Sequence, residues 1–159
     1  MHTILVVDDA PDACLILAKL LTKMGDKALC VGSGQLALDS LQLHIPSLVI
    51  LDVMMPDMDG MEVLRRIRGE PRTANLPVVM FSAIDDPAYP AYAKSKGAND
   101  FWVKGKLDFP ALHRLVAPYM PLADGGGGRR TDGGCDASLW SAIPQFSSVL
   151  SVVDSSGKV

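Results

Sequence analysis

Residues 47–60 read SLVILDVMMPDMDG, and this stretch decides the fold class. It begins with a short apolar run of aliphatic and β-branched residues, the composition of a buried strand. The run ends at Asp52, and a loop containing Pro56 leads to Gly60, after which a segment of helical period begins. A buried strand followed closely by an amphipathic helix is typical of a parallel sheet covered by helices.

The same alternation of strand and helix continues on both sides of this stretch. We expect five strands, at Thr3 to Val7, Lys27 to Val31, Ser47 to Leu51, Pro77 to Phe81 and Asp100 to Val103. We expect five helices: one ending near Gly25, one capped by Ser33, one opening after Gly60, one around Ala88 to Lys96, and one from Asp108 to about Ala117. In the third helix the arginines at 65, 66 and 68 are expected to face solvent. The sequence therefore predicts an α/β fold.

Composition narrows the class of protein. The chain has 159 residues, 48% of them hydrophobic, and a formal net charge of −3. This length and hydrophobic content suit one domain with a buried core. The net charge excludes the strongly basic surface that would attract nucleic acid or anionic lipid. Cys14, Cys30 and Cys135 show no metal-ligand spacing, and we interpret them as reduced and structural. Without a signal peptide or a membrane-length apolar run, we expect a cytoplasmic protein with neither nucleic acid nor membrane as a partner.

The amino-acid composition changes near Pro121. Six glycines between residues 125 and 134 indicate a flexible linker, so we expect a domain over 1–120 and a tail over 121–159. Apolar residues then recur at intervals of three and four between Leu139 and Val153, which is the spacing of a short helix near 138–153. Pro144 and several serines oppose a long helix, so a loose tail, a truncated segment and a docking helix all stay open.

Polar side chains follow successive strands of the predicted sheet. Asp8 and Asp9 follow the first strand, Asp52 the third, Ser82 the fourth and Lys104 the fifth. Ligands of open parallel sheets bind outside the carboxyl ends of the strands, so these groups converge if their strands are neighbours. Crowded carboxylates need a cation, and such hard oxygen ligands suit Mg²⁺.

This constellation suits phosphoryl transfer to a carboxylate. We expect Asp52 to be the nucleophile that forms an aspartyl phosphate, with Asp8, Asp9 and Asp52 itself holding the metal. Ser82 and Lys104 would each contact a phosphoryl oxygen. Taken singly, such an aspartate or serine is more often a helix cap, and such a lysine a surface charge; the functional interpretation depends on their joint placement.

Four sequence blocks closely resemble response-regulator receiver domains, in a match that covers about Met1 to Met120. They are Ile4-Leu5-Val6-Val7-Asp8-Asp9, Leu51-Asp52-Val53-Met54-Met55-Pro56-Asp57-Met58-Asp59-Gly60, Pro77-Val78-Val79-Met80-Phe81-Ser82-Ala83, and Gly97-Ala98-Asn99-Asp100-Phe101-Trp102-Val103-Lys104. The resemblance implies a doubly wound, flavodoxin-like parallel sheet of five strands in the order 2-1-3-4-5 with five helices. It also implies a two-component phosphorelay, in which a sensor histidine kinase or a histidine phosphotransfer domain phosphorylates Asp52.

The resemblance assigns further roles within the site. Met54 would give its backbone carbonyl to the metal, and Ser82 and Phe101 would shift together as a switch upon phosphorylation. Phe101 could equally be a core aromatic, and Trp102 should point to the opposite face of the sheet by strand alternation. A downstream protein, or a second copy of the chain, would bind the face made by the fourth helix, fifth strand and fifth helix.

One position departs from the family pattern. The family commonly has a cis-proline after the lysine, whereas here Gly105 follows Lys104. A cis bond before a residue other than proline costs about 2.5 to 4 kcal/mol, so the linkage can be trans. Glycine could still aim the lysine through unusual dihedrals, and Lys106 is an alternative cation.

Two alternatives to a phosphorylated switch stay open. A pseudo-receiver that binds partners without phosphorylation is favoured by Gly105 and opposed by the complete set of acidic residues. A magnesium-dependent phosphohydrolase is disfavoured because its nucleophile belongs to a DxD pattern after the first strand, where this chain has Asp8-Asp9-Ala10-Pro11. We expect a signalling domain rather than an enzyme.

Overall fold

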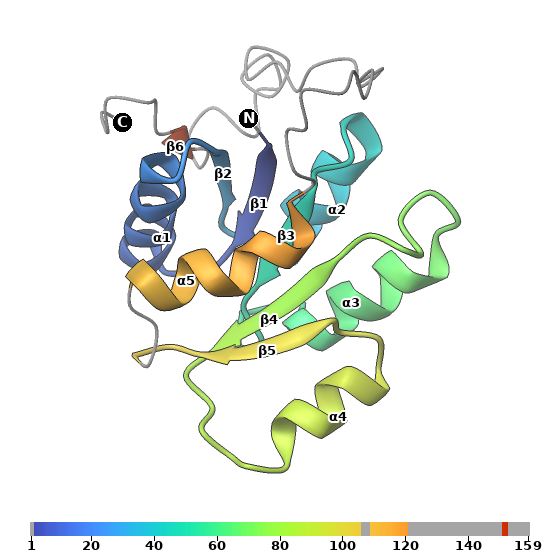
Figure 1. Cartoon of the computed structure of the whole chain (residues 1–159). Helices are drawn as coiled ribbons and strands as arrows, with labels where there is room; N and C mark the ends of the chain where they lie inside the picture. The colour runs from blue at the N-terminus through green and yellow to red at the C-terminus, as the bar shows by residue number, and fades with distance from the viewer. Residues whose placement is uncertain (1, 106–108, 121–150, 153–159) are drawn as a thin grey trace.

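The computed structural model describes residues 2–105, 109–120 and 151–152, and these form a three-layer α/β fold (Figure 1). The elements are, in chain order, β1 (Thr3–Val7), α1 (Pro11–Lys23), β2 (Lys27–Val31), α2 (Gly34–Leu43), β3 (Leu48–Leu51), α3 (Gly60–Gly69), β4 (Val78–Ser82), α4 (Tyr89–Ser95), β5 (Asp100–Val103), α5 (Phe109–Val116), the 3₁₀ turn η1 (Ala117–Tyr119) and β6 (Ser151–Val152).

The sheet has the predicted parallel arrangement. Its order is β5-β4-β3-β1-β2-β6, which contains the expected order 2-1-3-4-5. The first five strands are parallel, and β6 pairs antiparallel with β2 at the edge. All five predicted strands form within one residue of the predicted ends. Helices cover both faces of the sheet, so the side chains of the inner strands are buried on both sides. This explains why these strands are apolar throughout.

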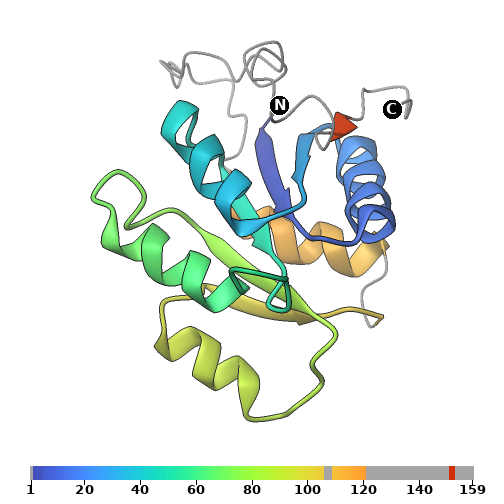
Figure 2. The ribbon, with the colours of Figure 1, turned by 180° about the vertical axis from the view of Figure 1, so that it is seen from behind.

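Helices cover both faces of the sheet, as the opposite views in Figures 1 and 2 show. On one face, α2, α3 and α4 pack on a cluster that includes Leu5, Val49 and Met80. On the other face, α1 and α5 pack on a cluster that includes Ile4 and Ile50. The two sets alternate along β1, β3 and β4, so the pleat divides the core into two layers of side chains. The carboxyl ends of the parallel strands are thereby fixed at one edge.

The helix ends follow their capping residues. The Ser33 hydroxyl accepts a hydrogen bond from the Leu36 N–H at 3.2 Å and caps α2, as predicted. Helix α4 has only seven residues and carries Pro90 in its first turn, where a proline removes no hydrogen bond. Helix α5 begins at Phe109 and is continued by η1. The predicted cap Asp108 lies outside the described residues.

The prediction that Arg68 faces solvent is wrong. Its guanidinium donates to the carbonyl oxygens of Gly97 at 2.9 Å and Leu76 at 2.7 Å and to the Asn99 side chain at 3.0 Å. It also donates to the carbonyls of Thr73 and Ala74. Helical periodicity places Arg68 near the edge of the polar face, and its long side chain bends back over the loops before β4 and β5.

Two predictions about other segments need correction. Cys14 and Cys30 are joined as a disulfide rather than reduced, because the contact of α1 with β2 brings their Cα atoms within 6.0 Å. Within the predicted helix near 138–153, Ser151 and Val152 form strand β6 instead, through pairing with Cys30 and Leu29. The other tail residues and Cys135 lie outside the described part, and the boundary at 120 stays a prediction.

Within the described residues, no helix combines the length and the apolar character needed to cross a membrane.

Candidate functional site: a carboxylate cluster at the carboxyl edge of the sheet

Three carboxylates meet where β1 and β3 end. Oxygen atoms of Asp8, Asp9 and Asp52 all lie within 4.8 Å of one another. The backbone holds two of these residues firmly: the Asp8 N–H donates to the Val31 carbonyl at 3.1 Å, and the Asp52 N–H donates to the Val7 carbonyl at 2.8 Å. Asp8 and Asp52 are buried, whereas Asp9 is exposed. The predicted convergence of these three residues is therefore present in the structure.

Lys104 reaches across this edge from the end of β5. Its Nζ lies 2.5 Å from Asp8 Oδ2 and 3.5 Å from Asp52 Oδ2, so one ammonium group contacts both buried carboxylates. The Lys104 N–H donates to the Ser82 carbonyl at 2.7 Å, which fixes the start of the side chain. The ammonium also lies 5.6 Å from the centre of the Phe81 ring, within reach of a cation–π interaction.

The linkage after Lys104 explains how the lysine reaches the site without a following proline. The described residues contain no cis peptide bond, so Lys104–Gly105 is trans, and Gly105 has a φ of +88°. That left-handed conformation favours glycine, and an added Cβ would meet no atom within 4 Å. The glycine therefore serves the backbone turn rather than a close contact. Lys106, the alternative cation, lies outside the described residues.

The electrostatics of Asp52 reflect the crowding. The pKa of Asp52 is raised from its ordinary 3.8 to about 6, mainly by burial and in addition by the neighbouring Asp8 carboxylate. Lys104 and a hydrogen bond from the Met54 N–H oppose this rise in pKa. One lysine thus leaves the negative charge of the cluster only partly compensated, which is the condition that attracts a further cation.

The loop after β3 brings the start of α3 against the backbone of Asp52. The Gly60 N–H donates to the Val53 carbonyl at 2.7 Å, and a Cβ on Gly60 would collide with the Asp52 carbonyl group. Glycine is required here by close approach. The Asp59 carboxylate accepts from the Glu62 N–H at 2.9 Å and caps α3. From the sequence, Gly60 is recognisable only as a helix start, since nothing in the pattern shows which backbone it meets.

Met54 lies beside Asp52 with its side chain directed outward. Its side chain is among the exposed large hydrophobic groups, with 65% of the residue surface accessible. The Met54 N–H lies 3.4 Å from Asp52 Oδ1. The Met54 backbone thus lies next to the cluster through its N–H, and the metal-binding role of its carbonyl stays an expectation from the family resemblance.

Ser82 and Phe101 lie on one face of neighbouring strands. Ser82 is fully buried, and its hydroxyl accepts from the Ile84 N–H at 3.1 Å. Met80 is the register partner of Phe101. Ser82 lies two residues beyond Met80 in β4, so its side chain is on the same face of the sheet as Phe101. Phe101 is 8% exposed and packs on Tyr89 of α4 at a centroid distance of 5.4 Å. No pattern in the sequence indicates this role of Tyr89, because its partner is a strand residue twelve positions away.

Trp102 points to the other face, as predicted. It is buried in the cluster beneath α1 and α5, and its indole N–H donates to the Asp100 carboxylate at 3.0 Å.

The residues present fit a divalent cation with oxygen ligands. Three carboxylates from two adjacent strand ends supply hard donors within the reach of one ion, and one of these residues is open to solvent. Mg²⁺ usually binds through one or two carboxylates and keeps several waters, so the exposed side of the cluster suits it.

Comparison with known proteins agrees with this geometry. Residues 4–117 match the response regulator receiver domain family. The transcriptional regulatory protein AfsQ1 of Streptomyces coelicolor is 36% identical over 104 residues, which cover 65% of this chain and 45% of that protein. The response regulator PleD of Caulobacter vibrioides is 36% identical over 64% of this chain and 22% of its own length. The chain thus spans less than half the length of these two curated relatives.

Solved structures give the same result for the fold. The signal receiver domain of a signal transduction histidine kinase from Syntrophus aciditrophicus is 30% identical, with a TM-score of 0.69 over 84% of this chain and 96% of that one. The BeF3-activated receiver domain of RstA from Klebsiella pneumoniae is 27% identical, with a TM-score of 0.68 over 76% of this chain and 100% of that one. The chain therefore belongs to the family of response regulator receiver domains of two-component signalling.

Proposed function

We propose that the domain accepts a phosphoryl group on Asp52 in the presence of Mg²⁺ and signals the change to a partner protein. The observation that carries this proposal is the joint position of Asp52, Asp8 and Lys104, with one ammonium group in contact with both buried carboxylates. A purely structural ion pair would need one carboxylate per lysine. The additional carboxylates, Asp9 among them, leave negative charge that a metal and an incoming phosphoryl group can use.

Each residue of the cluster would have its own role in phosphoryl transfer. An oxygen of Asp52 attacks phosphorus, the bond from phosphorus to the donor's histidine nitrogen breaks, and its electron pair leaves with the donor. Asp8 and Asp9 would hold Mg²⁺, with the Met54 carbonyl as a further ligand. The bound ion would supply charge neutralisation for the transferring group. Lys104 would leave Asp8 in part to pair with a phosphoryl oxygen, and the Ser82 hydroxyl would donate to another.

Signal output would begin at Ser82. Its hydroxyl would turn toward the phosphoryl group and give up its contact with the Ile84 N–H, and Phe101 would repack on the space that Ser82 leaves. Tyr89 links Phe101 to the exposed Tyr92, with ring centroids 5.4 Å apart in each pair, so repacking at β5 reaches the surface of α4.

We propose the face of α4, β5 and α5 as the surface for a downstream protein or a second copy of the chain. A sensor histidine kinase or histidine phosphotransfer domain would be the donor, and the cytoplasm the location.

The test is incubation of the full chain with Mg²⁺ and acetyl phosphate, followed by intact mass. We expect a gain of one phosphoryl group that EDTA prevents and that Asp52→Asn abolishes. Asp57→Asn is the matched control: Asp57 is exposed in the same loop and has a φ of +67°, which asparagine tolerates, so this variant should gain the group normally. Retained labelling of Asp52→Asn, or no labelling of the wild type by acetyl phosphate or a histidine-kinase donor, would contradict the proposal.

A further inference from the structure

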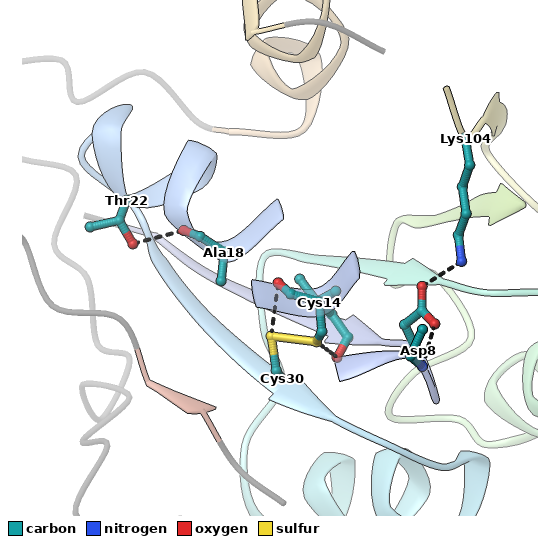
Figure 3. The surroundings of a disulfide bond; sticks show 8 residues. Asp8, Cys14, Ala18, Thr22, Cys30 and Lys104 are labelled. Carbon is teal, nitrogen blue, oxygen red and sulfur yellow. Dashed lines mark hydrogen bonds and ion pairs between the residues drawn. A yellow bond between two sulfur atoms is a disulfide. The ribbon is translucent and has the colours of Figure 1, made fainter. Parts of the chain in front are cut away.

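The disulfide between Cys14 and Cys30 joins α1 to β2 close to the carboxylate cluster. Figure 3 shows the bridge beneath the helix, with Asp8 and Lys104 meeting in the same region. The two residues are 16 apart in sequence, and they are only 4% and 3% exposed. Nothing in the phosphoryl-transfer chemistry uses them.

Backbone acceptors for both sulfur atoms are already in place. Cys14 Sγ lies 3.8 Å from the Val6 carbonyl oxygen, and Cys30 Sγ lies 3.3 Å from the carbonyl oxygen of Cys14. A thiol is a weak hydrogen-bond donor, so each sulfur would have an acceptor if the bridge were reduced. The same pocket can therefore hold the dithiol and the disulfide.

Both cysteines belong to the segments that hold the Asp8 loop. On the β2 side, Val31, the neighbour of Cys30, accepts the backbone hydrogen bond of Asp8 at 3.1 Å. On the α1 side, the Cys14 N–H donates to the Ala10 carbonyl at 3.2 Å, and the Ala10 N–H donates to Asp8 Oδ1 at 2.9 Å. The bridge thus closes a ring of contacts around residues 8–10, which include two of the three carboxylates.

The start of α1 lacks a side-chain cap. Its N-cap is Ala10, whose side chain makes no capping hydrogen bond. Alanine is a poor N-cap, so the first turn of such a helix frays more readily than a capped one. A covalent bond from Cys14 in that turn to Cys30, the next-to-last residue of β2, restrains the fraying.

We propose that Cys14 and Cys30 form a reversible dithiol–disulfide couple whose oxidised form raises the affinity of the Asp8, Asp9 and Asp52 cluster for Mg²⁺. The consequence for Mg²⁺ rests on the proposed function, whereas the redox couple itself does not. The physical reason is preorganisation: a loop already held in its binding conformation loses less conformational freedom when the ion binds.

The oxidant is a low-molecular-weight disulfide such as oxidised glutathione. One cysteine thiolate attacks it and expels one glutathione thiolate, giving a mixed disulfide. The second cysteine thiolate attacks the protein sulfur of that mixed disulfide and expels the other glutathione thiolate, and the two protons lost by the cysteines leave as glutathione thiols. The protein is oxidised by two electrons and the oxidant is reduced by two. Because both sulfurs are buried, exchange requires opening of the first turn of α1. The proposed location is the cytoplasm, and disulfides in such reducing compartments are usually transient or redox-sensing.

The test uses the full chain with Cys135→Ser, so that the pair alone can react. The protein is equilibrated with mixtures of oxidised and reduced glutathione, free thiols are blocked with iodoacetamide, and intact mass counts them. Calorimetric titration with Mg²⁺ then gives the affinity of each form. We expect two blocked thiols after reduction and none after oxidation, with Mg²⁺ binding about three- to tenfold tighter in the oxidised form.

The matched control is the further double variant Cys14→Ala with Cys30→Ala, which should bind Mg²⁺ like the reduced form and ignore glutathione. If it fails to fold, Cys30→Ala alone replaces it; this variant can form at most a mixed disulfide with glutathione and no intramolecular bridge. Failure to form an intramolecular disulfide would overturn the redox couple. A disulfide with unchanged Mg²⁺ affinity would overturn the coupling. Absence of Mg²⁺ binding in both forms would refute the proposed metal site and the coupling with it, while thiol counting would still decide on the couple.

Discussion

The two ends of the parallel strands differ in how their partly buried charged side chains are balanced. At the edge where β4 and β5 begin, Arg68 is surrounded by neutral acceptors, four carbonyl oxygens and one side-chain amide oxygen. Burial lowers the pKa of this guanidinium, and no carboxylate is among these five partners. At the edge where β1 and β3 end, Asp8 and Asp52 share one lysine, and the pKa of Asp52 is raised to about 6.

The difference separates a structural charge from a functional one. All three nitrogen atoms of the Arg68 guanidinium donate to neutral acceptors of the fold, so the side chain connects α3 with the loops before β4 and β5. The carboxylate cluster keeps unneutralised charge in a partly buried place, which is unfavourable for folding and useful only if something else binds there. Loss of Arg68 should therefore affect stability alone, whereas changes at the cluster should affect binding and chemistry more than stability.

Replacement of Arg68 by methionine should have the largest effect on stability. The variant leaves carbonyl groups and the Asn99 amide oxygen without their donor, and we expect a loss of about 2 to 4 kcal/mol in the free energy of unfolding. Urea titration measures it. Arg65→Met is the control, because that side chain is 70% exposed and pairs with Glu62 at the surface, and it should change stability by less than about 0.5 kcal/mol. Equal losses in the two variants would contradict the structural role of Arg68.

Replacement of Asp52 by asparagine should make the metal-free protein more stable at neutral pH. The folded-state pKa of Asp52 lies above its ordinary value, about 6 against 3.8, so the folded form binds the proton more tightly than the unfolded form does. Stability from this group is full below pH 3.8 and falls as pH rises through 6. The difference corresponds to at most about 3 kcal/mol, and lost contact with Lys104 and nearby solvent reduce the expected gain to about 1 kcal/mol.

The measurement is urea unfolding in EDTA at pH 4 and pH 7.5. The gain of Asp52→Asn over the wild type should be present at pH 7.5 and absent at pH 4, and Mg²⁺ should reduce it because only the wild type keeps all three carboxylates. A gain that did not depend on pH would mean that the burial of the Asp52 charge and its closeness to Asp8 are not the cause.

The sequence predicted the carboxylate edge better than the opposite one, for a physical reason. Asp8, Asp52, Ser82 and Lys104 each follow an apolar strand, and parallel strands bring their ends together, so local patterns determine the convergence. Arg68 has no such signal. Its partners lie in two loops that are 5 to 8 and 29 to 31 residues away, and only the tertiary structure brings them to one guanidinium.

The disulfide and β6 were missed for related reasons. The pairing of Cys14 with Cys30 depends on which turn of α1 lies over which residue of β2, and periodicity gives the face of a helix but not that register. The spacing of apolar residues near Leu139 to Val153 favoured a helix, whereas at Ser151 and Val152 pairing with the open edge of β2 decided the conformation. Edge pairing depends on the partner strand and overrides weak local preference.

Replacement of Lys104 by methionine should have a small effect on stability that depends on metal. Methionine keeps most of the length and removes the charge shared by Asp8 and Asp52, so the metal-free variant should lose about 1 kcal/mol in the free energy of unfolding, measured by urea titration in EDTA. Mg²⁺ should restore most of the loss, because the ion replaces the missing positive charge. Lys94→Met is the control: Lys94 is 55% exposed and lies 3.8 Å from Asp100, so neither the loss nor the restoration should appear.

The phosphorylated state should reveal the role of Lys104 more clearly than folding does. After treatment with acetyl phosphate, the thermal midpoint of the wild type should shift, whereas Lys104→Met should gain the phosphoryl group with a smaller shift, since the group lacks its cationic partner. If Lys104→Met instead unfolds with or without Mg²⁺, the lysine is a structural cation like Arg68. The contrast between the two edges would then fail at its central residue, because the charge at the carboxyl edge would be fully satisfied within the fold and no ligand would be needed to balance it.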